Sequence, residues 1–279
     1  MVATPIGNLN DFSPRGIETL RNAELIIAED TRVTMKLAQV FSFKTRMISC
    51  HRHNEESKAE SLAEYIQSEN LEAALVTDAG TPCISDPGSE LVAACAKRGI
   101  QVIPIPGCSA GVAAVSVSGF DSREFSFYGF LPREKKQLTE KLKEISHGTR
   151  VAIIHESPFR IIDLIGAIHE VIPDAGLTVC CDLTKLHETI IRGTPSEVLD
   201  ILRQNEKTEK GEYCVVMDLH GVQTETEVCK DREWTVEAKL AEEISRGKNL
   251  RDAQTALIEK GEKKNAVKKA ALVLKQSIV

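Results

Sequence analysis

The first 120 residues alternate between short apolar runs and amphipathic stretches. The apolar runs, near residues 24–27, 47–50, 73–77 and 101–105, are typical of buried strands. Between them, apolar positions recur at helical spacing near residues 14–22, 33–40, 56–68 and 89–98. Strands that alternate with helices in this way predict a parallel sheet with helices on both faces.

The pattern changes after Gly119. An aromatic segment, FSFYGFLPREKK, is followed by a second series of apolar runs near residues 151–154, 177–181, 189–192 and 213–219. Residues 223–232 are polar and strongly charged, which is typical of a linker, and helical periodicity returns after Trp234. The chain of 279 residues is longer than one hydrophobic core usually serves, so two α/β domains and a helical appendage are expected.

The stretch LVTDAGTPCISDPG, residues 75–88, carries a candidate ligand site. Asp86 and Pro87 precede SELVAACAKRG, which predicts a helix with Asp86 as its N-cap. The loop then lies at the carboxyl end of a strand, where open α/β sheets bind ligands. Gly80 and Gly88 permit close backbone approach. The alternative is an ordinary connection between a strand and a helix, although such connections usually need only about 2–6 residues.

Two further loops follow predicted strands, at residues 106–111 and 156–160, and all three loops are expected at one edge of the sheets. Ser109 is a candidate cap whose helix would turn its N–H groups towards a carboxylate; a turn without a ligand is the alternative. No GxGxxG or GxxxxGK[ST] motif occurs, which argues against dinucleotide and P-loop sites. Neither HE dipeptide continues to HExxH, and Ser157 is not in a GxSxG elbow.

Composition and charge narrow the class of protein. Apolar residues make up 42% and charged residues 27%, as in ordinary soluble proteins, and no run approaches a membrane span. We therefore expect a cytoplasmic protein. The eight cysteines form no CxxC pair and are expected to be buried thiols, with no metal site. The net charge is −6, yet residues 246–279 hold nine Lys or Arg against three Asp or Glu. This basic tail suggests a polyanionic partner, and a solvated helical surface is the alternative.

Eight strings, in order along roughly residues 1–220, carry a resemblance to one family. They are VATPIGNL (2–9), AEDTR (28–32), HRHNE (51–55), DAGTP...SDPG (78–88), PIPGCSAGVAAVSVSG (104–119), FYGFLP (127–132), HESPFR (155–160) and LTK (183–185). The chain resembles the small-subunit ribosomal RNA ribose 2'-O-methyltransferases I, a branch of the tetrapyrrole methylase superfamily. The family's sequences usually have a few residues before VATPIGNL, so a short or absent first strand is expected. Cys50, Arg52, Cys108 and His155 differ from the family's usual residues, so substrate contacts there are expected to differ.

The resemblance implies two α/β domains of tetrapyrrole methylase type with S-adenosylmethionine in the cleft between them. The expected domains are residues 1–120, a connection over 121–133, residues 134–222, a linker over 223–233, and a helical basic segment over 234–279. The expected cofactor-binding residues are Pro5, Asp78, Gly80, Thr81, Cys83, Ile84, Gly107, Ser109, Ala110 and Ser157. The resemblance also implies a homodimer and, as substrate, a cytidine ribose of small-subunit (16S) ribosomal RNA near the decoding centre.

A ribose hydroxyl is a weak acid, so its methylation calls for a general base. Asp30, His53 and Glu156 are the candidates, each in a family string that follows a strand. Each has a structural alternative: Glu29 and Asp30 could cap a helix, and His51 or His53 could be a structural imidazole. Arg32 and Arg52 suit phosphate, and Asn54 suits a base edge or ribose. Lys185 and Arg192 are expected to position RNA or form ion pairs.

Three other functions remain open at this stage. They are methylation of a small molecule, methylation of a protein on the same fold, and RNA binding or ribosome assembly without catalysis. The tail could likewise bind RNA by its charge or serve as a packing and dimerisation element, because AVKKAALVLK has an apolar face.

Overall fold

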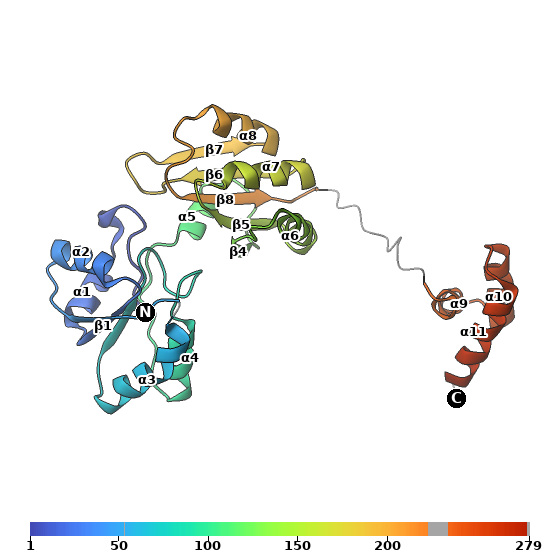
Figure 1. Ribbon diagram of the computed structural model, residues 1–279, viewed down its shortest axis with the longest axis horizontal. Helices are drawn as coiled ribbons and strands as arrows, with labels where there is room; N and C mark the ends of the chain where they lie inside the picture. The colour runs from blue at the N-terminus through green and yellow to red at the C-terminus, as the bar shows by residue number, and fades with distance from the viewer. Residues whose placement is uncertain (53, 223–233, 278–279) are drawn as a thin grey trace. The chain divides into compact units, whose positions relative to one another are not determined.

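The computed structural model describes residues 1–52, 54–222 and 234–277, and the chain forms two compact units, Met1–Gln223 and Thr224–Val279 (Figure 1). The larger unit contains two sheets. Seven of the eight cysteines lie among the described residues, and each of the seven is a free thiol. None of the helices in these residues has the length and apolar character that crossing a bilayer requires.

The first sheet consists of three parallel strands in the order β2-β1-β3 (β1 Leu25–Ala28, β2 Arg46–Ser49, β3 Ala73–Val76). All four residues of β1 are buried because helices cover both faces. Leu25 and Ile27 pack towards α3 (Glu55–Ser68) and α4 (Ser89–Lys97). Ile26 and Ala28 pack towards α1 (Pro14–Asn22) and α2 (Thr31–Phe41). The predicted parallel sheet with helices on both faces is confirmed.

The first strand and the strand predicted near residues 101–105 are each reduced to an isolated bridge. Val2 bridges Ile105 in parallel and Thr4 bridges Gly80 in antiparallel orientation. The Val2 N–H donates to the Leu75 carbonyl at 2.9 Å, so the N-terminal segment lies beside β3. The expectation of a short or absent first strand is borne out, whereas the prediction of a strand near residues 101–105 was wrong.

The second sheet has five strands in the order β4-β5-β8-β6-β7. β4 pairs in parallel with β5 and the other pairs are antiparallel. The strands are β4 Ser126–Phe130, β5 Val151–Glu156, β6 Gly176–Cys181, β7 Thr189–Gly193 and β8 Tyr213–Asp218. β4 lies within the segment expected to be only a connection between domains, so part of that segment belongs to the second sheet.

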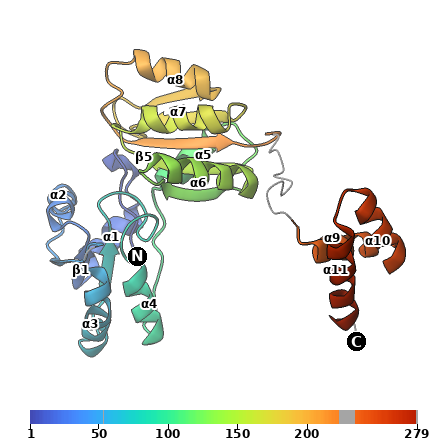
Figure 2. The same cartoon turned by 45° about the vertical axis from the view of Figure 1, so that its right-hand side comes forward.

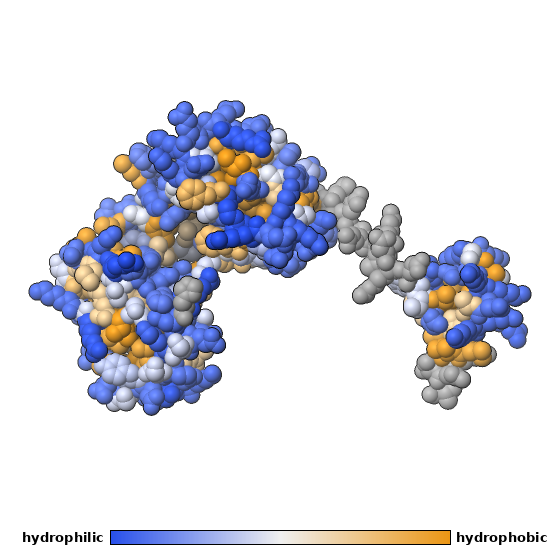
Figure 3. Space-filling model, in the orientation of Figure 1, coloured by the Kyte–Doolittle hydropathy of each residue, from blue (hydrophilic) through white to orange (hydrophobic). Residues whose placement is uncertain are grey.

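Helices cover the second sheet unequally. The short α5 (Ala110–Ser116) packs with Ile153, Cys180 and Cys214 on one face. The other face packs into the largest apolar cluster with three helices (Figures 1 and 2). These are α6 Lys135–Gly148, α7 Ile161–Val171 and α8 Pro195–Gln204. The face of the molecule drawn in Figure 3 is mostly polar, with apolar side chains in smaller groups.

The C-terminal unit is a set of three helices, α9 Val236–Ser245, α10 Leu250–Glu259 and α11 Lys264–Ser277. Its small core contains Leu240, Ala253, Leu257, Val267, Ala270 and Ala271. The buried Glu243 carboxylate accepts hydrogen bonds from Lys248 at 2.6 Å and Lys260 at 2.5 Å. The predicted helical C-terminal segment is confirmed.

Candidate active site

A cavity of about 370 Å³ lies in the larger unit, where loops of the first α/β half meet the second sheet. Its lining comes from several segments far apart in the sequence. They are Ile6, Ala79–Thr81, Ile84–Asp86, Ser109–Gly111, Phe127, Phe130, His155–Pro158, Cys180, Leu183 and Glu212–Cys214. The volume lies in the range of small-molecule sites, roughly 300–1,000 Å³.

Short contacts fix the loops on the first side of the cavity. Gly80 has φ +86°, a conformation that favours glycine, and exchanges backbone hydrogen bonds with Thr4 at 2.9 and 3.1 Å. The Thr81 hydroxyl donates to the Cys108 carbonyl at 2.9 Å, which ties residues 78–88 to residues 106–111. The predicted convergence of these two loops is therefore observed.

The helix after residues 78–88 begins later than expected. Its N-cap is Gly88, with φ +132°, and the first helical residue is Ser89. Asp86 as the N-cap was therefore wrong. The cap is supplied by Glu55, whose Oε1 accepts hydrogen bonds from the N–H groups of Gly88 at 2.7 Å and Glu90 at 2.8 Å.

The floor of the cavity is a row of residues across the second sheet. Phe130 of β4 pairs with His155 of β5, His155 pairs with Cys214 of β8, and Cys214 pairs with Cys180 of β6. Burial raises the pKa of the Cys180 thiol to about 11 and that of Cys214 to about 12. Burial also lowers the pKa of His155. The floor is therefore uncharged near neutral pH.

Six of the ten expected cofactor residues lie in the cavity wall: Gly80, Thr81, Ile84, Ser109, Ala110 and Ser157. Pro5, Asp78, Cys83 and Gly107 do not line it. A Cβ on Gly107 would meet the Ala3 Cβ at 2.9 Å, so this glycine permits packing against the N-terminal segment. Ser109 is the N-cap residue of α5, but its side chain makes no capping hydrogen bond.

The proposed general bases have different surroundings. Asp30 is the N-cap of α2, and its carboxylate also forms an ion pair of 2.6 Å with the Arg32 guanidinium. The hydrogen bonds from Arg32 lower the pKa of Asp30 to about 2, which makes it a weak base. The Glu156 side chain is fully buried; its Oε1 accepts a hydrogen bond from the Ser157 N–H, and its Oε2 lies 3.5 Å from Arg160. His53 lies outside the described residues. The capping alternative for Asp30 thus has direct support, and the base assignments stay predictions.

Asp86, which the sequence suggested only as a cap, lines the cavity as a half-buried carboxyl group. Burial, followed by repulsion from Glu29 and Asp78, raises its pKa to about 6. Among the described residues no hydrogen bond or ion pair involves its carboxylate. A proton acceptor with a pKa near the working pH is effective in general base catalysis. The two Asp residues of the loop were visible in the sequence, but which one faces a cavity was not.

The side chains proposed to contact RNA lie mostly in existing pairs. Arg32 is exposed and pairs with Asp30. Arg52 is exposed and donates to the Ser85 carbonyl at 3.5 Å, at the edge of the cavity loop. Asn54 accepts a hydrogen bond from the His51 N–H at 2.8 Å. Lys185 contacts Asp182 at 2.7 Å and Glu212 at 3.0 Å, which favours its ion-pair role. Arg192 donates to the Val117 carbonyl.

Comparison with known proteins agrees with this architecture. Residues 1–199 match the family described as Tetrapyrrole (Corrin/Porphyrin) Methylases, which is most of the chain. The chain belongs to the tetrapyrrole methylase family. Within this family it is similar to proteins named Ribosomal RNA small subunit methyltransferase I. The one from Halalkalibacterium halodurans is 43% identical over 227 residues, covering 81% of this chain and 78% of the relative. The one from Bacillus subtilis is 38% identical over 257 residues, which cover 91% of this chain and 86% of the relative.

Two solved structures share the fold. A diphthine synthase superposes with a TM-score of 0.59 at 14% identity, covering 78% of this chain and 88% of that one. The cobalt precorrin-4 methyltransferase CbiF superposes with a TM-score of 0.55 at 16% identity, covering 78% and 92%. The predicted family, fold class and use of S-adenosylmethionine are thereby confirmed.

The cavity also suits this cofactor chemically. Its volume and the backbone of Ala79–Thr81 are compatible with a nucleoside and an amino-acid moiety. His155 Nε2 and Glu156 Oε2 are buried without a hydrogen-bond partner among the described residues, and both residues line the cavity. Buried polar atoms normally have a partner; Glu156 Oε2 still has the Arg160 guanidinium at 3.5 Å, so it is the His155 Nε2 atom that fits a site completed by a polar ligand. In these residues no group of three or more His, Cys, Asp or Glu is placed to hold a metal ion.

Proposed function

We propose that the protein uses S-adenosylmethionine to methylate the ribose 2'-hydroxyl of a cytidine in small-subunit (16S) ribosomal RNA. The observation that carries this proposal is the similarity, 38–43% identical over most of the chain, to the named ribosomal RNA methyltransferases. The cavity at the meeting of the two α/β halves supports it independently, because it supplies a nucleoside-sized site. A ribosomal RNA substrate also implies a cytoplasmic location.

In this proposal the methyl donor occupies the cavity lined by Gly80, Thr81, Ser109 and Ser157. The bound cofactor supplies an electrophilic methyl group, and methyl transfer is an in-line displacement in which alignment dominates. The chain's own part is to fix the donor between the two loops, to exclude water, and to remove the proton of the attacking hydroxyl. The uncharged floor of His155, Cys214 and Cys180 adds no competing thiolate, because both thiols stay protonated near neutral pH.

We propose Asp86 as the acceptor of that proton. Its position in the cavity wall and its raised pKa of about 6 support this role better than the surroundings of Asp30 or Glu156 do. His53 remains a second candidate. A carboxylate with a pKa near 6 is ionised at neutral pH and is more basic than an ordinary Asp.

Two partners belong to the proposal. The C-terminal unit would hold RNA phosphates, since α11 presents Lys264, Lys268 and Lys269, which are exposed and form no ion pair among the described residues. A homodimer would cover the exposed side chains of Pro104, Pro106 and Val112, which line a second hollow beside α5. Sedimentation of the full chain tests the dimer.

The test of the function is methyl transfer in vitro. Purified protein, radiolabelled S-adenosylmethionine and unmodified small ribosomal subunits are incubated, and the RNA is digested to nucleosides for mass spectrometry. Labelled 2'-O-methylcytidine from the small-subunit RNA supports the proposal. Label on a base, or label only in protein, contradicts the ribose assignment.

A further inference from the structure

β4 contains a bulge beside the cavity. Its pairing with β5 shifts register between Phe127 and Gly129, and Gly129 has φ +61°. Residues three apart in a regular strand face opposite sides, because side chains alternate. Here the extra residue puts Phe127 and Phe130 on the same side, and bulges beside active sites commonly re-aim a side chain in this way.

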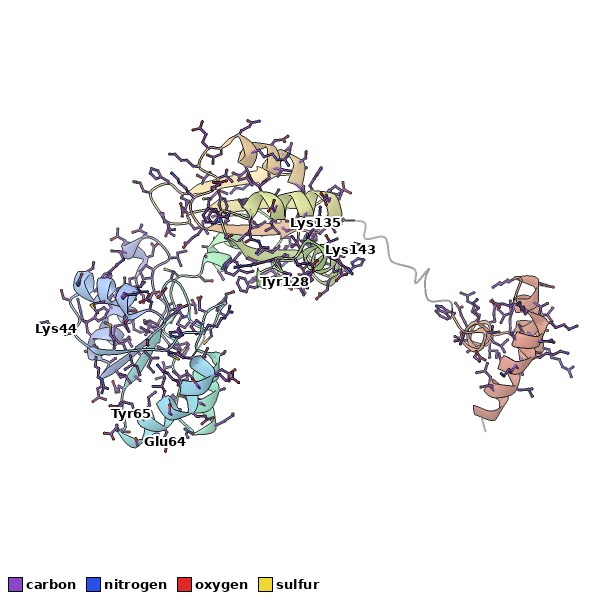
Figure 4. All side chains as sticks on the ribbon, viewed as in Figure 1. Lys44, Glu64, Tyr65, Tyr128, Lys135 and Lys143 are labelled. Atoms are coloured by element: carbon purple, nitrogen blue, oxygen red, sulfur yellow. The ribbon has the colours of Figure 1, made fainter. Side chains whose placement is uncertain are left out.

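Ring contacts confirm the orientation of the two phenylalanines. Both rings pack edge-to-face on His155, with centroid distances of 5.0 Å for Phe127 and 5.8 Å for Phe130. Tyr128 lies on the other face of the sheet, beside α6, where Lys141 Nζ is 5.4 Å from its ring centroid (Figure 4). The bulge therefore directs Phe130 to the cavity side.

Phe130 is unusual in being exposed there. Its ring lines the cavity yet remains 61% exposed, whereas Phe127 is half-buried against α5. The bulge also brings β4 close to residues 78–88, which we call the cofactor loop, because a Cβ on Gly129 would meet the Ser85 Oγ at 2.8 Å. A strand that departs from regular pairing to expose an apolar ring at a cavity mouth points to a ligand that covers the ring.

We propose that Phe130 is the surface on which the base of the target nucleotide stacks. The inference rests on the proposed function and names how the RNA is held. RNA-binding proteins recognise single-stranded, unstacked bases by stacking them on aromatic side chains. His155 supports the Phe130 ring from one side. The exposed part of the ring lies at the cavity mouth, where the ribose must meet the methyl group.

Kinetics with small subunits test the proposal. Stacking of a base on an aromatic ring contributes about 1–3 kcal/mol, so Phe130→Ala should raise KM for the RNA substrate by about 5- to 150-fold. The affinity for S-adenosylmethionine, measured by calorimetry, should change less than about twofold. Phe130→Tyr should retain most of the wild-type KM, because its ring still stacks. Phe125→Ala is the matched control: Phe125 is 44% exposed beside the same strand but does not line the cavity, so its KM should be unchanged.

A spectroscopic readout separates stacking from a structural effect. In a Trp234→Phe background, which removes the chain's one tryptophan, Phe130→Trp places an indole at the site. A short single-stranded RNA containing cytidine should quench its fluorescence. Unchanged KM in Phe130→Ala, with cofactor affinity and wild-type activity intact, overturns the stacking role and leaves the proposed function standing. A change of oligomeric state alone in Phe130→Ala also overturns it, because the ring would then belong to a subunit interface.

Discussion

The Glu55 carboxylate and the Gly88 N–H form a hydrogen bond of 2.7 Å between two separate family strings. The same oxygen accepts the Glu90 N–H, so a residue of HRHNE caps the helix that follows the cofactor loop. Glu55 is only 6% exposed. The HRHNE string thus has a structural task beside any contact with RNA, which is to hold the end of residues 78–88.

Glu55→Ala should destabilise the protein by about 1–3 kcal/mol, because it leaves buried N–H groups without an acceptor. It should also weaken cofactor binding, since the loop loses its anchor. Glu55→Gln keeps an oxygen acceptor and should lose less on both measures. Urea denaturation and calorimetry provide the two readouts, and wild-type stability in Glu55→Ala would contradict the capping role.

Asp86→Asn should lower kcat by about 10²- to 10⁴-fold, the usual contribution of a general base. Cofactor affinity should be nearly unchanged, because the side chain keeps its size. In the wild type, kcat/KM should rise with pH through about 6 as the carboxyl group ionises. Asp30→Asn and Glu156→Gln are the comparison variants. Full activity of Asp86→Asn would return the assignment to His53 or to water.

The same carboxyl group should make stability pH-dependent. Its pKa in the folded state, about 6, lies above the ordinary value of 3.8, so the folded protein binds the proton more tightly than the unfolded chain does. The contribution of Asp86 to stability is therefore present below about pH 4 and is lost as pH rises to about 6. Asp86→Asn should melt at a higher temperature than the wild type at pH 7.5, and the difference should shrink at pH 4. An unchanged melting temperature at pH 7.5 would contradict the raised pKa of Asp86 in the folded protein.

The sequence predicted the fold well where local signals and tertiary packing agree. The periodicity over residues 14–22 predicts the observed helix, and the buried runs of β1 and β3 carry no competing signal. It failed where a partner distant in the sequence decides. Glu55 caps α4 from 33 residues away, so Asp86 is not needed as a cap. Gly107 lies in a sequence that is typical of a ligand-binding loop, but the group that requires a glycine there is Ala3 of the N-terminal segment.

The candidate site could be predicted only in part, because only some of its residues carry a local sequence signal. Residues of the cofactor loop carry their signal in Gly, Pro and Thr, and several of them line the cavity. Phe130 and Cys214 reach the cavity only through strand register and a bulge, which no local pattern encodes. His155 was noticed as a departure from the family, yet its place on the floor depends on its pairing with Cys214.

Removal of the C-terminal unit should flatten the salt dependence of RNA binding. Each phosphate contact contributes a slope of about −0.7 to −0.9 in log affinity against log salt. A version ending at Glu233 should lose most of the slope, and Lys264→Gln, Lys268→Gln and Lys269→Gln together should reduce it by about 2–3 units. The choice of nucleotide should persist, because it would reside in the cavity. Equal slopes with a change only in oligomeric state would support the packing role of the tail instead.

The most direct test of the account is calorimetry of S-adenosylmethionine and its demethylated product with wild type, Gly80→Val and Gly119→Val. Both glycines have similar positive φ, +86° and +81°, so both variants carry similar backbone strain. Only Gly80 lines the cavity, and a Cβ on Gly119 meets nothing within 4 Å. We expect binding by the wild type and Gly119→Val and none by folded Gly80→Val. Absence of binding heat from folded wild type at several temperatures, or equal binding by all three proteins, would contradict the placement of the cofactor in this cavity.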